Sequence, residues 1–160
     1  MNARSWLGLA AAVALSEGAG ALGALSTAPA IASGWYAGLA KPLLMPPAWL
    51  FAPVWLALYA LMGVALYLAW EARERSALAC LLGLWLFFLQ LGANALWSPI
   101  FFGARSPALA LLDIGILWLL ILATLALFAR LSRPAAWLLA PYLAWVTFAL
   151  YLNLAIVLLN

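Results

Sequence analysis

Long apolar stretches alternate with short polar or proline-rich segments along this chain. A helix that crosses a bilayer needs about 20 apolar residues. Five segments reach that length, which predicts membrane-spanning helices over about 5–26, 48–70, 77–102, 108–129 and 135–158. We therefore expect an all-α integral membrane protein, a bundle of five transmembrane helices that forms a single domain over residues 1–160.

The first apolar segment is also compatible with a signal peptide, because Arg4 precedes it. Its apolar run extends from Ser5 to Ser26, which exceeds the roughly 7–15 residues of a usual signal-peptide core. We expect this segment to be retained as the first helix of the bundle.

The connection between the first two helices is rich in proline. Three prolines lie close together in it: Pro42, Pro46 and Pro47. Each one fixes φ, removes a backbone donor and favours extended geometry in the preceding residue. The pattern predicts an ordered, non-helical loop over 35–47, with Pro47 in the first turn of the next helix. This loop contains Tyr36 and the only lysine, Lys41, and we expect residues 27–47 to cap one end of the bundle.

The small number of charged residues identifies the surroundings of the protein. Hydrophobic residues make up 71% of the chain and charged residues 7%, whereas soluble domains contain about 25% charged residues. The lipid bilayer is therefore an expected partner. The net charge of +3 comes from basic residues that occur singly or in pairs, so nucleic acid is not an expected partner.

Basic residues in the connections predict the orientation in the membrane. Five arginines fall on the N-terminal side: Arg4, Arg73, Arg75, Arg130 and Arg133. Only Lys41 and Arg105 fall on the other side. In an inner membrane this asymmetry places the N-terminus in the cytoplasm. An outer or organellar membrane is the alternative, and there the rule loses its force.

The absence of histidine excludes several kinds of active site. The chain has no histidine and a single cysteine, Cys80. A Ser-His-Asp triad, a histidine general base, a proximal-histidine haem and a zinc or iron–sulfur centre are therefore excluded. We expect no catalytic residue, no metal site and no resident cofactor.

Polar and deep aromatic residues of the helices gather toward the side that carries the loop. With a rise of 1.5 Å per residue from that face, Trp55 lies about 10 Å deep, Asn94 about 12 Å and Trp145 about 20 Å. Further polar residues on the same side are Glu17, Asp113 and Asn153. These depths predict a shared polar and aromatic cavity beneath the loop.

Helical spacing supports such a cavity, because residues three or four positions apart share a helix face. Three rows have this spacing: Phe51, Trp55 and Tyr59; Gln90, Asn94 and Trp97; and Trp145, Ala149 and Asn153. In the third row, the gap at Ala149 would accept a flat ligand between the Trp145 ring and the Asn153 amide.

Structural roles are the alternative for several of these residues. Asp113 lies early in the fourth helix, where the dipole favours a carboxylate, and its partner would then be Asn94 or Ser98. Glu17 would be protonated or hydrogen-bonded in helix packing, and Trp118 would contact lipid or packed side chains. Small residues recur along the first helix: Gly8, Ala12, Ser16, Gly20 and Ala24. That stripe either packs within the bundle or forms the seam of a homodimer.

Motifs from Trp35 to Asn153 resemble the translocator protein family, also called tryptophan-rich sensory proteins or peripheral benzodiazepine receptors. They are WYAGLAKP, MPPAW, NALWSPIFFGAR, ALALLD and PYLAWVTFALYLN. The resemblance implies a five-helix bundle, often a homodimer, in which the loop after the first helix closes a ligand cavity. Its ligands would be porphyrins such as protoporphyrin, sterols, and isoquinoline or benzodiazepine-type drugs. Leu154 replaces the tyrosine of the sterol motif, which speaks against sterol recognition there.

Spacing and resemblance together give the residues expected to bind the ligand: Tyr36, Phe51, Trp55, Tyr59, Asn94, Trp97, Trp145, Phe148 and Ala149. Asp113, Ser98 and Glu17 are expected to supply polar support. The function that fits best is a membrane receptor, sensor or translocator for porphyrins and related hydrophobic ligands. A light- or oxygen-dependent porphyrin-degrading enzyme and a structural membrane subunit are the alternatives.

Overall fold

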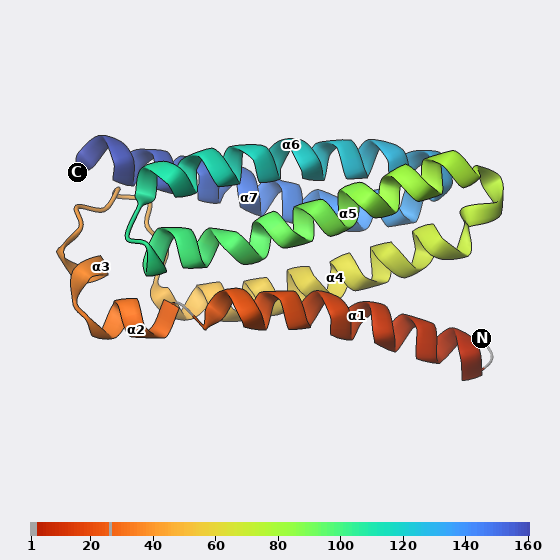
Figure 1. The fold of residues 1–160 in the computed structure, drawn as a ribbon, viewed down its shortest axis with the longest axis horizontal. Coiled ribbons are helices and arrows are strands. Elements are labelled where there is room, and N and C mark those ends of the chain that lie inside the picture. The colour runs from red at the N-terminus through yellow and green to blue at the C-terminus, as the bar shows by residue number, and fades with distance from the viewer. Residues whose placement is uncertain (1–2, 26) are drawn as a thin grey trace.

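The structure, a computed structural model, describes residues 3–25 and 27–160 (Figure 1). In that part of the chain, five helices are long and apolar enough to cross a membrane. They are α1 (Ala3–Ala24), α4 (Phe51–Glu71), α5 (Ala77–Ser98), α6 (Pro107–Leu131) and α7 (Arg133–Leu159). Each overlaps one of the predicted segments, so the all-α membrane fold is confirmed.

Serine and proline residues mark where three of the long helices begin. The Ser76 hydroxyl accepts a hydrogen bond from the Ala79 backbone and caps α5, and Ser132 caps α7 through Ala135 in the same way. Helix α6 begins at Pro107, whose fixed φ and missing N–H suit a first helical turn.

Helix α5 continues beyond Ser98 as a short π-helix, η3 (Pro99–Gly103). Pro99 has no N–H to continue the regular ladder, and the turn is closed by the Ala104 N–H donating to the Pro99 carbonyl. A π turn changes the direction in which side chains leave the helix axis. Here Phe101 is buried and Phe102 is half-buried at the end of the bundle.

The five long helices lie side by side and form a closed ring (Figure 1). Helix α1 packs against α4 and α5, α7 packs against α4 and α6, and α5 packs against α6. Helices α4 and α5 follow each other in sequence but contact each other little, so a short connection does not make them a packed pair. The N and C ends lie at opposite ends of the bundle (Figure 1), as five spans require.

The connection between α1 and α4 is the non-helical loop that the prolines predict from residue 39 to residue 47, but not before it. It contains two short helices, α2 (Thr27–Ala32) and α3 (Trp35–Gly38). Residues 35–38 precede Pro42, the first proline of the predicted loop, so they are free to form a helical turn. Gly34, just before them, has a φ of 74°, a conformation that glycine adopts readily. Pro47 has extended backbone and precedes the first turn, η1 (Ala48–Leu50), instead of lying within it.

The small residues of α1 pack within the bundle against α4. Ser16 is fully buried, and a side chain added at Gly20 would collide with the Tyr59 ring. A Cβ added at Gly63 would lie 2.4 Å from the Cα of Val13. The two backbones therefore cross closely, and residues of the stripe serve the chain's own packing.

Gly63→Ala is expected to lower the thermal unfolding temperature of the purified protein in detergent. The added methyl group has no room against the α1 backbone, and overpacking of this kind typically costs about 1–3 kcal/mol. Gly92→Ala is the matched control, because a Cβ there meets nothing within 4 Å. Alanine is the better helix former, so the control should unfold at the same or a higher temperature. Equal destabilisation by both variants would contradict the close crossing.

Candidate functional site

The short helices after α1 rest on the π turn at the end of α5. The Trp35 and Tyr36 rings meet Phe101 edge to face, with centroids 5.9 and 6.3 Å apart, and Tyr36 meets Phe102 at 5.3 Å. Burial raises the pKa of the Tyr36 phenol, so the hydroxyl stays protonated and donates to the sulfur of Met45. Tyr36, expected to bind ligand, thus anchors the loop.

Polar contacts fix the same connection at three further points. The Lys41 ammonium donates to two carbonyl oxygens near α3. The Asn160 amide forms two hydrogen bonds with the Ala40 backbone, accepting from its N–H at 3.0 Å and donating to its carbonyl at 3.1 Å. The hydroxyls of Thr27 and Ser98 lie 2.7 Å apart. Ser98, expected as polar support for a ligand, therefore secures α2.

Deeper in the bundle, one asparagine joins three helices. The Tyr59 hydroxyl of α4 donates to Oδ1 of Asn94 on α5, and Nδ2 of Asn94 donates to the Tyr142 hydroxyl of α7 at 2.9 Å. The Trp55 ring stacks on Tyr59 with centroids 5.4 Å apart and meets Tyr142 edge to face at 6.2 Å. We call Trp55, Tyr59, Asn94 and Tyr142 the central tier.

A second group of rings lies between the central tier and the loop. Phe51 meets Trp145 at 5.9 Å, and Trp145 meets Phe148 at 5.8 Å. Helix α4 runs away from the loop and α7 runs toward it (Figure 1), so Phe51 and Trp145 lie nearer the loop than Trp55 and Tyr142. The predicted depths are wrong on this point, because the helix ends are not level with one another.

The third row predicted on α7 does not present a free amide to a ligand. Oδ1 of Asn153 accepts from the Trp97 indole at 3.0 Å, and Nδ2 donates to the Pro107 carbonyl at 2.8 Å. Trp97 also stacks on Phe101 with centroids 4.9 Å apart. Asn153 and Trp97 therefore tie α7 to α5 and to the start of α6. Ala149 is partly buried against the core.

The two acidic residues expected as polar support do not reach the amide of the central tier. Oδ2 of Asp113 is buried and has no hydrogen-bond partner in the described part of the chain. Its expected partners, Asn94 and Ser98, are bonded elsewhere, so that prediction is wrong. Glu17 is half-buried on α1.

Buried polar atoms without a partner mark where a polar group of a ligand would be stabilised. Besides Asp113, they are the indole nitrogen of Trp145 and both amide atoms of Gln90, among the residues that the structure describes. Leaving such a group unpaired costs about 1–3 kcal/mol. Trp145 thus combines a ring for stacking with an unpaired donor.

Sequence reasoning missed three features of this region. Tyr142 lies three residues before Trp145 on one helix face, and that spacing was the signal for it. Trp118 packs against the core, which is one of the two alternatives predicted, but its indole also donates to the Thr147 hydroxyl at 2.8 Å, and this hydrogen bond was not predicted. The role of Phe101 carried no sequence signal, because it depends on the π turn and on loop docking.

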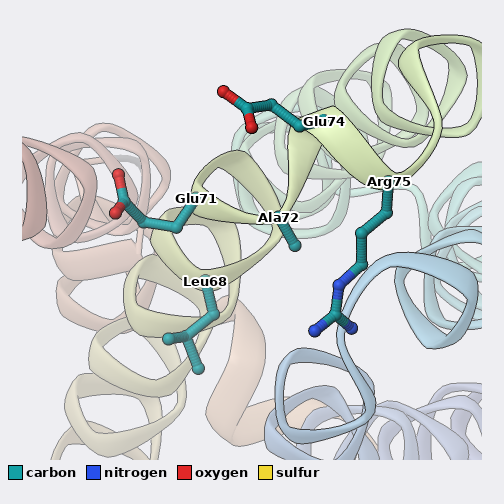
Figure 2. A pocket seen from close by; sticks show the side chains of 5 residues that line it. All are labelled: Leu68, Glu71, Ala72, Glu74 and Arg75. Atoms are coloured by element: carbon teal, nitrogen blue, oxygen red, sulfur yellow. The ribbon is translucent and has the colours of Figure 1, made fainter.

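An open hollow of about 350 Å³ lies at the other end of the bundle, at the turn between α4 and α5 (Figure 2). Its lining residues are Leu68, Glu71, Ala72, Glu74 and Arg75. Both glutamate side chains point away from Leu68 and Arg75 (Figure 2), and the Arg75 guanidinium donates to the Leu131 carbonyl at 2.8 Å. None of the residues expected to bind ligand lines this hollow.

Fold and site together define a multi-pass integral membrane protein of five helices, with aromatic rings gathered around a buried amide beneath a folded loop. Comparison with protein families agrees with this class. The model of the TspO/MBR family matches residues 12–159, and the chain belongs to this family.

Relatives share much of the chain's length. A tryptophan-rich protein TspO of Chlorobaculum tepidum is 44% identical over 158 residues, covering 96% of each chain. A translocator protein of Ovis aries is 42% identical over 119 residues, covering 74% of this chain and 70% of the sheep protein. A tryptophan-rich sensory protein of Cereibacter sphaeroides is 39% identical, covering 79% of this chain and 77% of the relative.

Asn160→Ala is expected to speed proteolysis within residues 38–45 several-fold under native conditions, measured by mass spectrometry of the fragments. The variant loses both hydrogen bonds to the Ala40 backbone, and each typically contributes about 1 kcal/mol. Leu159→Ala is the control, since Leu159 is adjacent and 53% exposed. Rapid cleavage of the unmodified protein in this segment would show that the loop is not held against the bundle.

Proposed function

We propose that this chain is a membrane receptor or sensor that binds porphyrins such as protoporphyrin around the central tier and Trp145. A flat ring would stack on Trp55 and Trp145, and Asn94 would orient its edge. The observation that carries the proposal is the central tier, in which three aromatic rings surround one buried amide. Sites for flat organic ligands are mostly apolar with a few placed polar groups.

Family membership supports the receptor or sensor role, since relatives carry the names sensory protein and translocator protein. Movement of the ligand across or along the membrane is the further step that the second name suggests. Sterols and isoquinoline or benzodiazepine-type drugs extend the range of ligands in this proposal. The proposal also includes a homodimer and an N-terminus that lies in the cytoplasm.

Binding would replace contacts that the rings make with each other. A ring pair such as Phe51 and Trp145 contributes about 0.5–1.5 kcal/mol beyond its burial. Truncating a buried aromatic anchor in an interface typically costs about 2 kcal/mol or more. Stacking on a larger porphyrin would have to offset the loss of one such ring pair.

A titration with protoporphyrin separates this function from its alternatives. Purified protein is mixed with protoporphyrin in the dark and in light, and the absorption spectrum is followed. A spectral shift without a new product supports a receptor, and a new absorbing species supports a porphyrin-degrading enzyme. No shift contradicts both and favours a structural subunit.

Trp55→Ala and Trp145→Ala are each expected to weaken protoporphyrin binding at least about tenfold in fluorescence titrations, because each removes an aromatic anchor. Trp6→Ala and Trp70→Ala are the controls, because their rings are 59% and 48% exposed. The controls should change affinity less than about twofold. Asn94→Leu should be intermediate, because the stacking rings remain. All variants are first checked for helicity and monodispersity. Equal losses in the two pairs would place the site elsewhere.

Protoporphyrin and its iron or zinc complexes are expected to bind with affinities within about tenfold of each other, a difference of about 1.4 kcal/mol. The chain has no histidine to ligate the metal, so stacking should decide the affinity. Competition titrations in one detergent give the three dissociation constants. A preference for the iron complex well above tenfold would reveal a metal ligand and overturn this expectation.

A further inference from the structure

Two turns of the chain meet at the end of the bundle opposite the loop. One is η2 (Arg73–Arg75), between α4 and α5, and the other joins α6 to α7 at Ser132. The Arg75 guanidinium donates to the carbonyl of Leu131, the last residue of α6, at 2.8 Å. Carbonyls at a helix end have no partner within the helix, and the dipole there attracts a cation. Arg75 therefore ties together two turns that are 56 residues apart in sequence.

Positive charge gathers around this contact. Leu131 lies in sequence between Arg130, in the last turn of α6, and Arg133, the first residue of α7, and both arginines are exposed. We call Arg75, Arg130 and Arg133 the arginine cluster. Both glutamates of the neighbouring hollow point away from Arg75 (Figure 2). The bond from Arg75 goes to a carbonyl oxygen, which leaves the positive charge of its guanidinium without a neutralising anion in the described part of the chain.

Arg133 stands where helix electrostatics disfavour a cation. It is the first residue of α7, and the N-terminal end of a helix carries a partial positive charge that repels a guanidinium and attracts anions. Arg130, in contrast, lies in the last turn of α6, where the dipole favours a positive charge. The stability of α7 therefore gives no reason for an arginine at position 133, whereas an anion bound beside it does.

Exposed aromatic rings place the arginine cluster at the surface of the bilayer. Trp70 near the end of α4 is 48% exposed, and Trp137 in the second turn of α7 is 74% exposed. Tryptophan gathers at the interface between hydrocarbon and water. Trp137 also shares a helix face with Arg133, because the two are four residues apart. A molecule with a charged head and an apolar chain fits this pair of side chains.

We propose that the arginine cluster binds the phosphate group of an anionic phospholipid. Arginine presents its N–H groups as a fork that matches phosphate oxygens, and basic pockets between membrane helices suit anionic headgroups. The phosphate lies on the α7 side of Arg75, away from Glu71 and Glu74, and an acyl chain runs along Trp137. This site is at the opposite end of the bundle from the central tier, so it does not depend on the proposed function.

Native mass spectrometry of the purified protein tests the proposal, with an equimolar mixture of dioleoylphosphatidylglycerol and dioleoylphosphatidylcholine. The two lipids have the same chains and one phosphate each, but only the first carries a net negative charge. The unmodified protein should prefer phosphatidylglycerol by at least about fivefold, roughly the effect of one basic residue near an anionic surface. The preference is a ratio within one sample, which cancels differences in detergent and in total lipid.

Arg133→Gln should lower this preference below about twofold, because it removes the charge and the fork at the start of α7. The variant should remain folded, since the helix dipole disfavours a cation at this position. Arg133→Lys keeps the charge and should retain more of the preference than Arg133→Gln. Arg105→Gln is the matched control, an exposed arginine in a turn at the loop end. Its preference should stay within about twofold of that of the unmodified protein, because distant charges are screened.

Three results with these lipids would overturn the proposal. Equal binding of the two lipids by the unmodified protein would leave the arginines only the role of orienting the chain in the membrane. An unchanged preference in Arg133→Gln would remove the cluster from the site. Equal losses in Arg133→Gln and Arg105→Gln would show attraction by net charge alone.

Inorganic phosphate distinguishes a lipid headgroup from a soluble anion. It is added as a competitor at millimolar concentration, with the ionic strength held constant by chloride. Phosphatidylglycerol that stays bound supports the lipid site, because the acyl chain along Trp137 adds apolar burial that free phosphate lacks. Displacement by phosphate would assign the cluster to a soluble anion and overturn the proposal.

Discussion

The Asn94 amide is the interaction around which the interior of this bundle is arranged. It joins α4, α5 and α7 through Tyr59 and Tyr142, although α4 and α5 hardly contact each other. A bilayer offers no water to a buried amide, so the chain itself must satisfy it. Hydrogen bonds between membrane helices contribute only about 0.6–2 kcal/mol each. Their main effect is therefore geometric: they fix where the rings of Trp55, Tyr59 and Tyr142 stand relative to one another.

Asn153 likewise links neighbouring helices through its amide, at the loop end of the bundle. Its amide is 1% exposed and connects the Trp97 indole with the Pro107 carbonyl. Trp97 stacks in turn on Phe101, and Phe101 supports the Trp35 and Tyr36 rings. The loop thus rests on a surface that is fixed from within the membrane. Burial raises the pKa of Tyr36, so its bond to Met45 is insensitive to pH near neutrality.

The two ends of the bundle differ in the kind of side chain that they offer. The loop end and the central tier combine aromatic rings with a few unpaired buried polar atoms. The opposite end has an open hollow edged by Glu71, Glu74 and Arg75, which lie at the turn between two helices. Flat hydrophobic ligands suit the first arrangement, because rings stack and a single amide gives direction.

The sequence by itself determined the membrane class, the five helices and most residues of the aromatic interior. Apolar length decides whether a segment spans a bilayer, and positions four apart share a helix face, so the row of Phe51, Trp55 and Tyr59 was visible without a structure. Apolar length and helical spacing are both properties of a single helix.

The sequence of a single helix does not determine how far that helix is shifted along its neighbours. Only the tertiary structure decided this shift. Helix α7 is displaced relative to α4, which reversed the predicted depths of Trp55 and Trp145. The π turn after Ser98 turned Phe101 toward the loop. The amides of Asn94 and Asn153 found partners on other helices, and Asp113 was left without one in the described chain. Hydrogen-bond partners depend on shifts of a few ångströms between helices, and no pattern within a single helix encodes those shifts.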